Sequence, residues 1–318
     1  MSSRPLALVI STNNDPQLEI LHQIPHVTGN TLEAFERAAP EAEVILNWSG
    51  GSALLRSVFL ACPRLRWVHS RSAGLDKTLF PELVESSIPL TNGTGVFSQS
   101  LGEFVLAAVL YFAKDFPRMM RNQRAGRWEP FNVEEIAFQT AGIVGYGDIG
   151  RAAARRMHAM GMKVLALKRH APASPDPFIA GFFKPDQMSE MLGQCDYVIV
   201  AAPLTPETHH MVSDAQFASM KPTAIIINVG RGPVIDQAAM VRALRSNRIR
   251  GAGLDVFEQE PIPAGDPIWQ LDNVLVSPHC ADNTRDWLND AMHFFLKQYS
   301  RFEKGEPLEN IVEKHLGY

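Results

Sequence analysis

Short apolar runs alternate with stretches of helical spacing along almost the whole chain, and this alternation limits the folds open to it. Strands that alternate with helices form parallel sheets whose connections cross over their faces. The apolar runs that predict strands in the first part of the chain are 6–10, 43–47, 67–70 and 89–91. A second series follows at 140–144, 163–167, 197–201, 224–228, 253–257 and 274–277. The pattern predicts an α/β protein with two parallel sheets.

A glycine-rich turn follows the strand predicted at 140–144, and a helical stretch follows the turn. Its residues are Gly145, Tyr146, Gly147, Asp148, Ile149 and Gly150. In this context the first glycine permits a tight turn, the second lets backbone approach a diphosphate, and the third lets helix pack on strand. Amides at the helix N-terminus then face the phosphate charge. A glycine turn without a ligand is the alternative, but the flanking strand and helix favour a dinucleotide site.

Two helical stretches mark where the predicted domains join. Residues 99–125 have helical spacing, with Ser98 or Ser100 as N-cap, and Pro117 is expected to kink or break that helix. Residues 285–303 form another amphipathic stretch that ends near Gly305. We expect a flavodoxin-like substrate domain (1–98 and 287–318) into which a Rossmann dinucleotide-binding domain (99–286) is inserted.

The residues after the second strand of this dinucleotide domain favour one nicotinamide cofactor over the other. Sites for NAD place a carboxylate there for the ribose hydroxyls, whereas this chain has Lys168 and Arg169. Cations attract a 2′-phosphate. We therefore expect NADP(H) to be preferred, with NAD(H) possible; two solvated surface cations are the alternative.

Composition excludes several other classes of protein. The formal net charge is −4 without a basic stripe, which argues against nucleic-acid binding. The longest apolar stretch, 104–113, is too short to cross a membrane. Cys62, Cys195 and Cys280 are widely spaced and form no CxxC pair, which is typical of reduced thiols in a cytoplasmic protein without a metal site.

Three side chains suited to acid–base chemistry follow predicted strands of the second series. They are Arg231, Glu260 and His279. Ligands of open parallel sheets bind beyond the carboxyl ends of the strands. An arginine fork can bind a carboxylate, a histidine can give a proton to a carbonyl oxygen, and a neighbouring carboxylate favours the imidazolium. Each alone is ordinary, but together they predict a catalytic set.

Five segments occur in a fixed order along the chain: GIVGYGDIG, APLTPET, INVGRGPVID, GLDVFEQEP and SPHCADNT. By these segments the chain resembles the D-isomer-specific 2-hydroxyacid dehydrogenases, nearest to short glyoxylate/hydroxypyruvate reductases. It implies an oxidoreductase that transfers a hydride between a nicotinamide dinucleotide and a small 2-oxo or 2-hydroxy acid, with Arg231, Glu260 and His279 as its catalytic residues. It also implies a homodimer formed through the cofactor domain.

Further roles follow from the resemblance alone. Asp255 would face the nicotinamide carboxamide. Ala202, Pro203 and Thr208 would line the cofactor, with the backbone of Val229 near the ribose. The RSAGLD segment would hold the substrate carboxylate on the amides of Ala73 and Gly74, and Trp48 would lie in the substrate pocket or serve as a core aromatic.

Two other functions remain open at this point. An enzyme of the same fold could act on a bulkier 2-oxo acid, depending on the volume around Trp48, Leu75 and Trp287. A non-enzymatic, dinucleotide-sensing protein similar to a transcriptional corepressor is the second alternative. The complete Arg–Glu–His set favours an enzyme.

Overall fold

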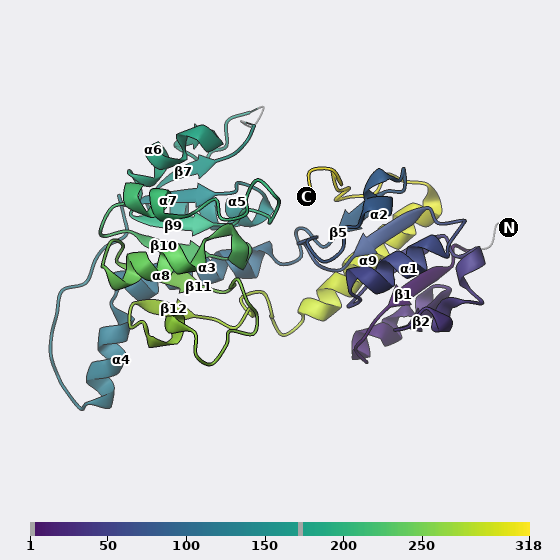
Figure 1. Cartoon of the computed structure of the whole chain (residues 1–318), viewed down its shortest axis with the longest axis horizontal. Helices are drawn as coiled ribbons and strands as arrows, with labels where there is room; N and C mark the ends of the chain where they lie inside the picture. The colour runs from purple at the N-terminus through teal and green to yellow at the C-terminus, as the bar shows by residue number, and fades with distance from the viewer. Residues whose placement is uncertain (1–3, 171–173) are drawn as a thin grey trace. The chain divides into compact units, whose positions relative to one another are not determined.

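The computed structural model describes residues 4–170 and 174–318, which form two compact units (Figure 1). The terminal unit contains the chain up to Phe97 together with Asn283–Tyr318, and the inserted unit is Ser98–Asp282. These divisions lie slightly before the boundaries at 98/99 and 286/287 expected from the sequence.

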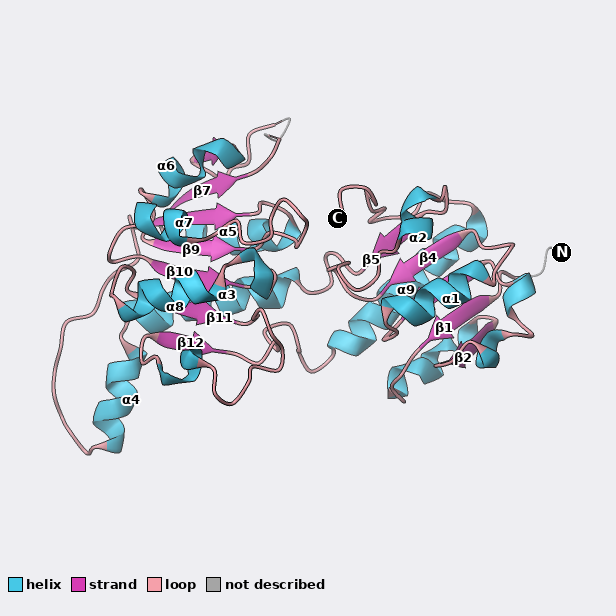
Figure 2. Cartoon of the chain, viewed as in Figure 1, coloured by secondary structure: helices cyan, strands magenta, loops and turns pink. Residues whose placement is uncertain are grey.

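A five-stranded parallel sheet forms the centre of the terminal unit, in the order β2-β1-β3-β4-β5 (Figure 2). This is the flavodoxin-like order expected from the sequence. Its strands are β1 (Ala7–Ile10), β2 (His26–Gly29), β3 (Val44–Asn47), β4 (Trp67–Ser70) and β5 (Leu90–Asn92). Its α-helices are α1 (Ser52–Leu60), α2 (Pro81–Glu85) and α9 (Trp287–Lys304). Residues of β1 and β3 are fully buried, which is why they read as continuous apolar runs.

A seven-stranded parallel sheet forms the inserted unit, in the order β12-β11-β10-β9-β6-β7-β8 (Figure 2). Its strands are β6 (Thr140–Val144), β7 (Lys163–Leu167), β8 (Gly181–Phe183), β9 (Tyr197–Val200), β10 (Ile225–Asn228), β11 (Gly251–Leu254) and β12 (Val274–Val276). Its helices are α3 (Ser98–Ala113), α4 (Phe116–Arg124), α5 (Asp148–Ala159), α6 (Met188–Leu192), α7 (Asp214–Ser219) and α8 (Gln237–Arg245). The chain reverses direction across the sheet between β6 and β9, which is where such sheets bind ligands. The predicted fold class, two doubly wound parallel sheets, is confirmed.

The sequence prediction differs from the structure mainly at sheet edges. The edge strands β2 and β8 were not predicted because half of β2 (HVTG) is polar or glycine and β8 (GFF) contains no β-branched residue. The strand predicted at 253–257 begins earlier, at Gly251, and ends at Leu254. The break expected at Pro117 occurs just before it, where Asp115 has φ 49° and caps α4 through the backbone N–H of Arg118. Among the described residues, no helix is both long and apolar enough to cross a membrane.

The last helix, α9, completes the core of the terminal unit. Its Phe295 ring stacks on Trp67 of β4 with centroids 5.5 Å apart, and Phe294 and Phe295 both lie beside the ring of His69. The hydroxyl of Tyr299 donates to the carbonyl of Pro5, two residues before β1. The helix α9 therefore packs in the same unit as the first strands of the chain.

We expect His69 to make the fold sensitive to acid. Burial lowers its pKa from 6.5 to about 3, and its Nδ1 lies 2.7 Å from Oγ1 of Thr91. The unfolded chain therefore binds a proton at pH values where the folded chain does not. Because of this difference in proton binding, the free energy of unfolding decreases as the pH falls from about 6.5 toward 3. Each tenfold difference in proton affinity corresponds to about 1.4 kcal/mol.

Urea unfolding between pH 7.5 and 4.5 measures this loss. His69→Gln keeps a polar group for Thr91 but does not titrate, so its unfolding free energy should fall less over this range. Equal pH dependence in the two proteins would contradict the prediction.

Candidate active site

The glycine-rich turn joins β6 to α5 at the point where the sheet order reverses. Gly145 has φ +94°, and a Cβ atom there would lie 2.5 Å from backbone atoms of Ala202. A Cβ at Gly150 would lie 2.4 Å from the carbonyl oxygen of Gly145. At Gly147 a Cβ would meet no heavy atom within 4 Å. The protein itself fills the space at Gly145 and Gly150, whereas exposed Gly147 leaves room for a ligand.

The start of α5 provides the amides that such a turn needs. No side chain caps this helix at Gly147, and exposed Asp148 is its first residue. The first-turn N–H groups of a helix have no intrahelical partners, so they suit an anion. The ring of Tyr146 is buried edge-on against Phe182, and Ile149 is half-buried. Tyr146 thus contributes its ring to packing and its backbone to the turn.

Lys168 and Arg169 follow β7 directly, and both are exposed. The backbone N–H of Lys168 donates to Phe183 of β8, which fixes the start of this segment. A hydrogen bond from Thr205 lowers the pKa of Glu207, and the charge of Arg169 adds a smaller contribution. The cation of Arg169 therefore lies close enough to the 205–207 turn to act on the carboxylate of Glu207.

His279 and Glu260 form a hydrogen-bonded pair. Nδ1 of His279 lies 2.7 Å from Oε2 of Glu260, and the other carboxylate oxygen accepts from the backbone N–H of Phe257 at 2.9 Å. The two side chains are 41% and 33% exposed. Because Glu260 occupies Nδ1, the ring orientation is set and Nε2 is the nitrogen left for a reacting group.

Asp255 fixes the turn that carries His279. It is buried, and its Oδ1 accepts from the hydroxyl of Ser277 at 2.5 Å and from the amides of Cys280 and Ala281 at 2.9 and 3.1 Å. His279 itself has φ 51°, an unusual value for a residue other than glycine. Asp255 therefore has a structural function in addition to the cofactor contact expected from the sequence.

The turn that carries Arg231 packs directly against the turn that carries Glu260. A Cβ at Gly232 would lie 1.9 Å from the carbonyl carbon of Phe257, so only glycine permits this approach. Asn228 donates to the carbonyl of Arg231 at 3.1 Å, and Nη1 of Arg231 donates to the carbonyl of Gly230 at 2.9 Å. A close backbone contact thus connects the turns that carry Arg231 and Glu260, and the hydrogen bond between His279 and Glu260 connects the third predicted catalytic turn to them.

The remaining predicted cofactor residues lie between these turns and the glycine-rich turn. The backbone of Ala202 touches Gly145, and its carbonyl would lie 2.6 Å from a Cβ at Gly230. Thr208 donates to the carbonyl of Pro203 at 2.7 Å, which closes the turn after β9. Buried Val229 donates from its backbone to Val200 at 3.0 Å.

Asp282 is a charged neighbour that the sequence reasoning did not single out. Burial raises its pKa, while the charges of His279 and Arg231 oppose that rise and Asp255 adds to it. Asp282 belongs to the SPHCADNT segment, so its proximity to His279 in the sequence was the available signal.

The predicted substrate residues of the terminal unit lie at its strand ends. Trp48 follows β3 and is 1% exposed, with its Nε1 donating to Asp15 at 2.7 Å. Ala73 and Gly74 are half-buried in the loop after β4, and Asn92 donates to the carbonyl of Ala73 at 2.8 Å. In the described parts of the chain, no group of three or more His, Cys, Asp or Glu side chains is arranged to hold a metal ion.

Comparisons with known proteins agree with this geometry. The family model for the NAD binding domain of D-isomer specific 2-hydroxyacid dehydrogenases matches residues 106–281. A glyoxylate reductase of Korarchaeum cryptofilum is 34% identical over 81% of this chain and 79% of its own. A glyoxylate/hydroxypyruvate reductase B of Citrobacter koseri is 36% identical over 83% and 82%.

A solved structure has the same fold over its full length. It is a D-isomer specific 2-hydroxyacid dehydrogenase of Xanthobacter autotrophicus Py2 in complex with NADPH and MES. It is 32% identical, covers 100% of both chains and gives a TM-score of 0.86. Together with the glycine-rich turn, these findings identify a nicotinamide dinucleotide as the cofactor.

Two glycine substitutions should separate folding from cofactor binding. Gly145→Ala places a Cβ against Ala202 at an unfavourable φ and should reduce the unfolding free energy by about 1–3 kcal/mol. Gly147→Ala meets no protein atom and should keep the wild-type melting temperature while weakening dinucleotide binding, measured by fluorescence titration. Wild-type affinity in Gly147→Ala would place the diphosphate elsewhere.

Proposed function

The chain belongs to the D-isomer specific 2-hydroxyacid dehydrogenase family, and from that premise we propose that it reduces glyoxylate or hydroxypyruvate with NADPH. The proposal rests mainly on the hydrogen bond between Nδ1 of His279 and Oε2 of Glu260, which is 2.7 Å long. The turn that carries Arg231 packs against the turn that carries Glu260. The relatives named for these two substrates support the choice of a small 2-oxo acid.

The residues present suit a bound nicotinamide dinucleotide. The open space at Gly147 and the uncapped start of α5 suit its diphosphate. The cations of Lys168 and Arg169 suit the 2′-phosphate on the adenosine ribose of NADP(H). Asp255 and the turn after β9 are proposed to hold the nicotinamide end. When bound, this cofactor supplies the hydride that reduces the 2-oxo carbon.

His279 supplies the proton for the same reaction. Its Nδ1–H donates to Glu260, so in the imidazolium form the Nε2–H is available to the carbonyl oxygen of the substrate. Glu260 holds the ring in this orientation through the hydrogen bond to Nδ1. Arg231 binds the substrate carboxylate and polarises the carbonyl group.

Substitution of His279 and Arg231 tests this assignment. His279→Asn should lower kcat by about 10²–10⁴-fold, because the proton donor is lost, while NADPH binding measured by fluorescence stays as in the wild type. Arg231→Ala should chiefly raise KM for the acid and lower kcat/KM. A His279→Asn protein that retains kcat would remove this residue from the mechanism.

We propose a preference for NADP(H) over NAD(H). Lys168 and Arg169 are exposed beyond the end of β7, where a carboxylate would favour NAD. The Xanthobacter relative contains NADPH, which supports the proposal.

The double variant Lys168→Ser, Arg169→Ser should raise KM for NADPH at least about tenfold, since each charge-assisted hydrogen bond contributes about 1.5–3 kcal/mol. KM for NADH should change little. Lys163→Ser, at the amino end of the same strand, is the matched control and should behave as wild type. A higher kcat/KM with NADH than with NADPH in the wild type would refute the preference.

We also propose that the chain forms a homodimer through α4 and residues 125–138. Figure 1 shows α4 projecting from the sheet of its unit, followed by a long connection. Exposed apolar side chains gather on this arm, with Trp128 98% and Phe138 93% exposed. Such a patch marks a protein interface, and a monomeric mass by light scattering would exclude it.

A cytoplasmic location is proposed from the three free cysteines, Cys62, Cys195 and Cys280. Cell fractionation that places the protein in an oxidising compartment would rule this out.

A further inference from the structure

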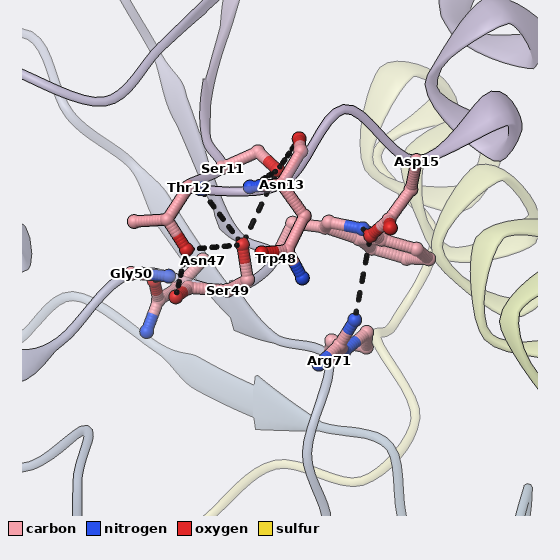
Figure 3. Close-up of polar contacts among 9 residues, drawn as sticks. All are labelled: Ser11, Thr12, Asn13, Asp15, Asn47, Trp48, Ser49, Gly50 and Arg71. Atoms are coloured by element: carbon pink, nitrogen blue, oxygen red, sulfur yellow. Dashed lines mark hydrogen bonds and ion pairs between the residues drawn. The ribbon is translucent and has the colours of Figure 1, made fainter. Parts of the chain in front are cut away.

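Side chains join loops that follow separate strands in both units. In the terminal unit a hydroxyl group does so: Ser49 Oγ accepts from the backbone N–H of Thr12 at 2.8 Å, which joins the segments after β3 and β1 (Figure 3). In the inserted unit a histidine and a carboxylate do so. Nε2 of His210, in the segment after β9, lies 2.6 Å from Oε1 of Glu258, in the segment after β11. Glu258 stands two positions before Glu260, so this second histidine–glutamate pair adjoins the proposed catalytic pair along the chain.

Glu258 is also hydrogen-bonded to the start of α8. Its Oε1 accepts from the backbone N–H of Gln237 at 3.2 Å, and its backbone N–H donates to Oε1 of Gln237 at 3.3 Å. Gln237 is the first residue of α8, the helix that follows the turn carrying Arg231. The Glu258 carboxylate therefore joins three segments, which follow β9, β10 and β11.

The imidazole of His210 is held in place by contacts of its own. Its backbone has φ 51° and donates to the carbonyl of Pro233 at 2.8 Å. Its ring stacks on that of His209, with centroids 4.0 Å apart and an interplanar angle of 25°. Because an ionised carboxylate only accepts hydrogen bonds, Nε2 of His210 carries the hydrogen that Glu258 accepts. His210 is thus a donor of fixed position beside the segment 257–260.

Each glutamate of the segment 257–260 has a histidine partner. Glu260 pairs with His279, and Glu258 pairs with His210. The His210 and Glu258 side chains are 39% and 34% exposed, and such a pair contributes little to the stability of a fold. At a reacting group, by contrast, a misplacement of about 1 Å can cost on the order of 10²-fold in rate. The second pair should therefore matter more for the geometry of the first pair than for folding.

We propose that His210 and Glu258 are positioning residues for the reaction. They fix the segment 257–260, so that Glu260 holds the His279 ring with Nε2 toward the substrate. Both act through Glu260 and not by contact with the reacting atoms. The inference rests on the proposed function, because it concerns the same proton donor, and all of these residues belong to the inserted unit.

Steady-state kinetics with NADPH and either glyoxylate or hydroxypyruvate test the inference. His210→Ala removes the donor to Glu258 and should lower kcat about tenfold, while KM for NADPH and the melting temperature stay as in the wild type. His210→Gln offers an amide N–H in place of Nε2–H and should keep kcat within about twofold of the wild type. Glu258→Ala also loses the contacts with Gln237, so it should lower kcat at least as much as His210→Ala.

A double variant shows whether His210 acts through Glu260. Adding His210→Ala to Glu260→Ala should change kcat by less than about twofold, because the group to be positioned is already missing. His315→Ala is the matched control. His315 lies 3.9 Å from Glu85 in another exposed histidine–carboxylate pair, which belongs to the terminal unit, and its loss should leave kcat as in the wild type.

The outcomes separate the two proposals. A wild type that reduces neither acid contradicts the proposed function and with it this inference. With an active wild type, three results overturn the inference alone: a His210→Ala protein with wild-type kcat, a His210→Gln protein as slow as His210→Ala, or a further loss of about tenfold in the double variant.

Discussion

The buried carboxylate of Asp255 determines where the imidazole of His279 can lie. One of its oxygens accepts three hydrogen bonds from the segment between Ser277 and Ala281, and His279 sits inside that segment with a left-handed backbone. A charged acceptor with three donors is among the stronger anchors available inside a protein. The geometry of the proposed catalytic residues therefore depends first on a side chain that is not itself proposed to transfer the proton.

Close contacts between backbone segments fix the positions of the other turns as well. Gly232 brings the Arg231 turn against Phe257, and Phe257 in turn donates to Glu260. Gly145 brings the glycine-rich turn against Ala202, and Gly230 lies against the same residue. These contacts hold together four loops that follow separate strands.

Sequence reasoning predicted the central strands well, since β4, β6 and β7 have the predicted bounds. Full burial makes such strands visible as apolar runs, whereas β2, with the sequence HVTG and only partly buried, leaves no such pattern. The pairing of His279 with Glu260 was expected from their positions after strands. The Asp255 anchor and the pairing of His210 with Glu258 were not, because tertiary contacts between distant turns have no local pattern.

The position of α9 in the chain has a consequence for biosynthesis. The inserted unit is complete once Asp282 has been synthesised. At that point the terminal unit still lacks α9, the helix that covers Trp67 and His69. Domains fold as units while the ribosome extends the chain. The domain that begins first must therefore finish last, and its aromatic face stays uncovered until the final segment emerges.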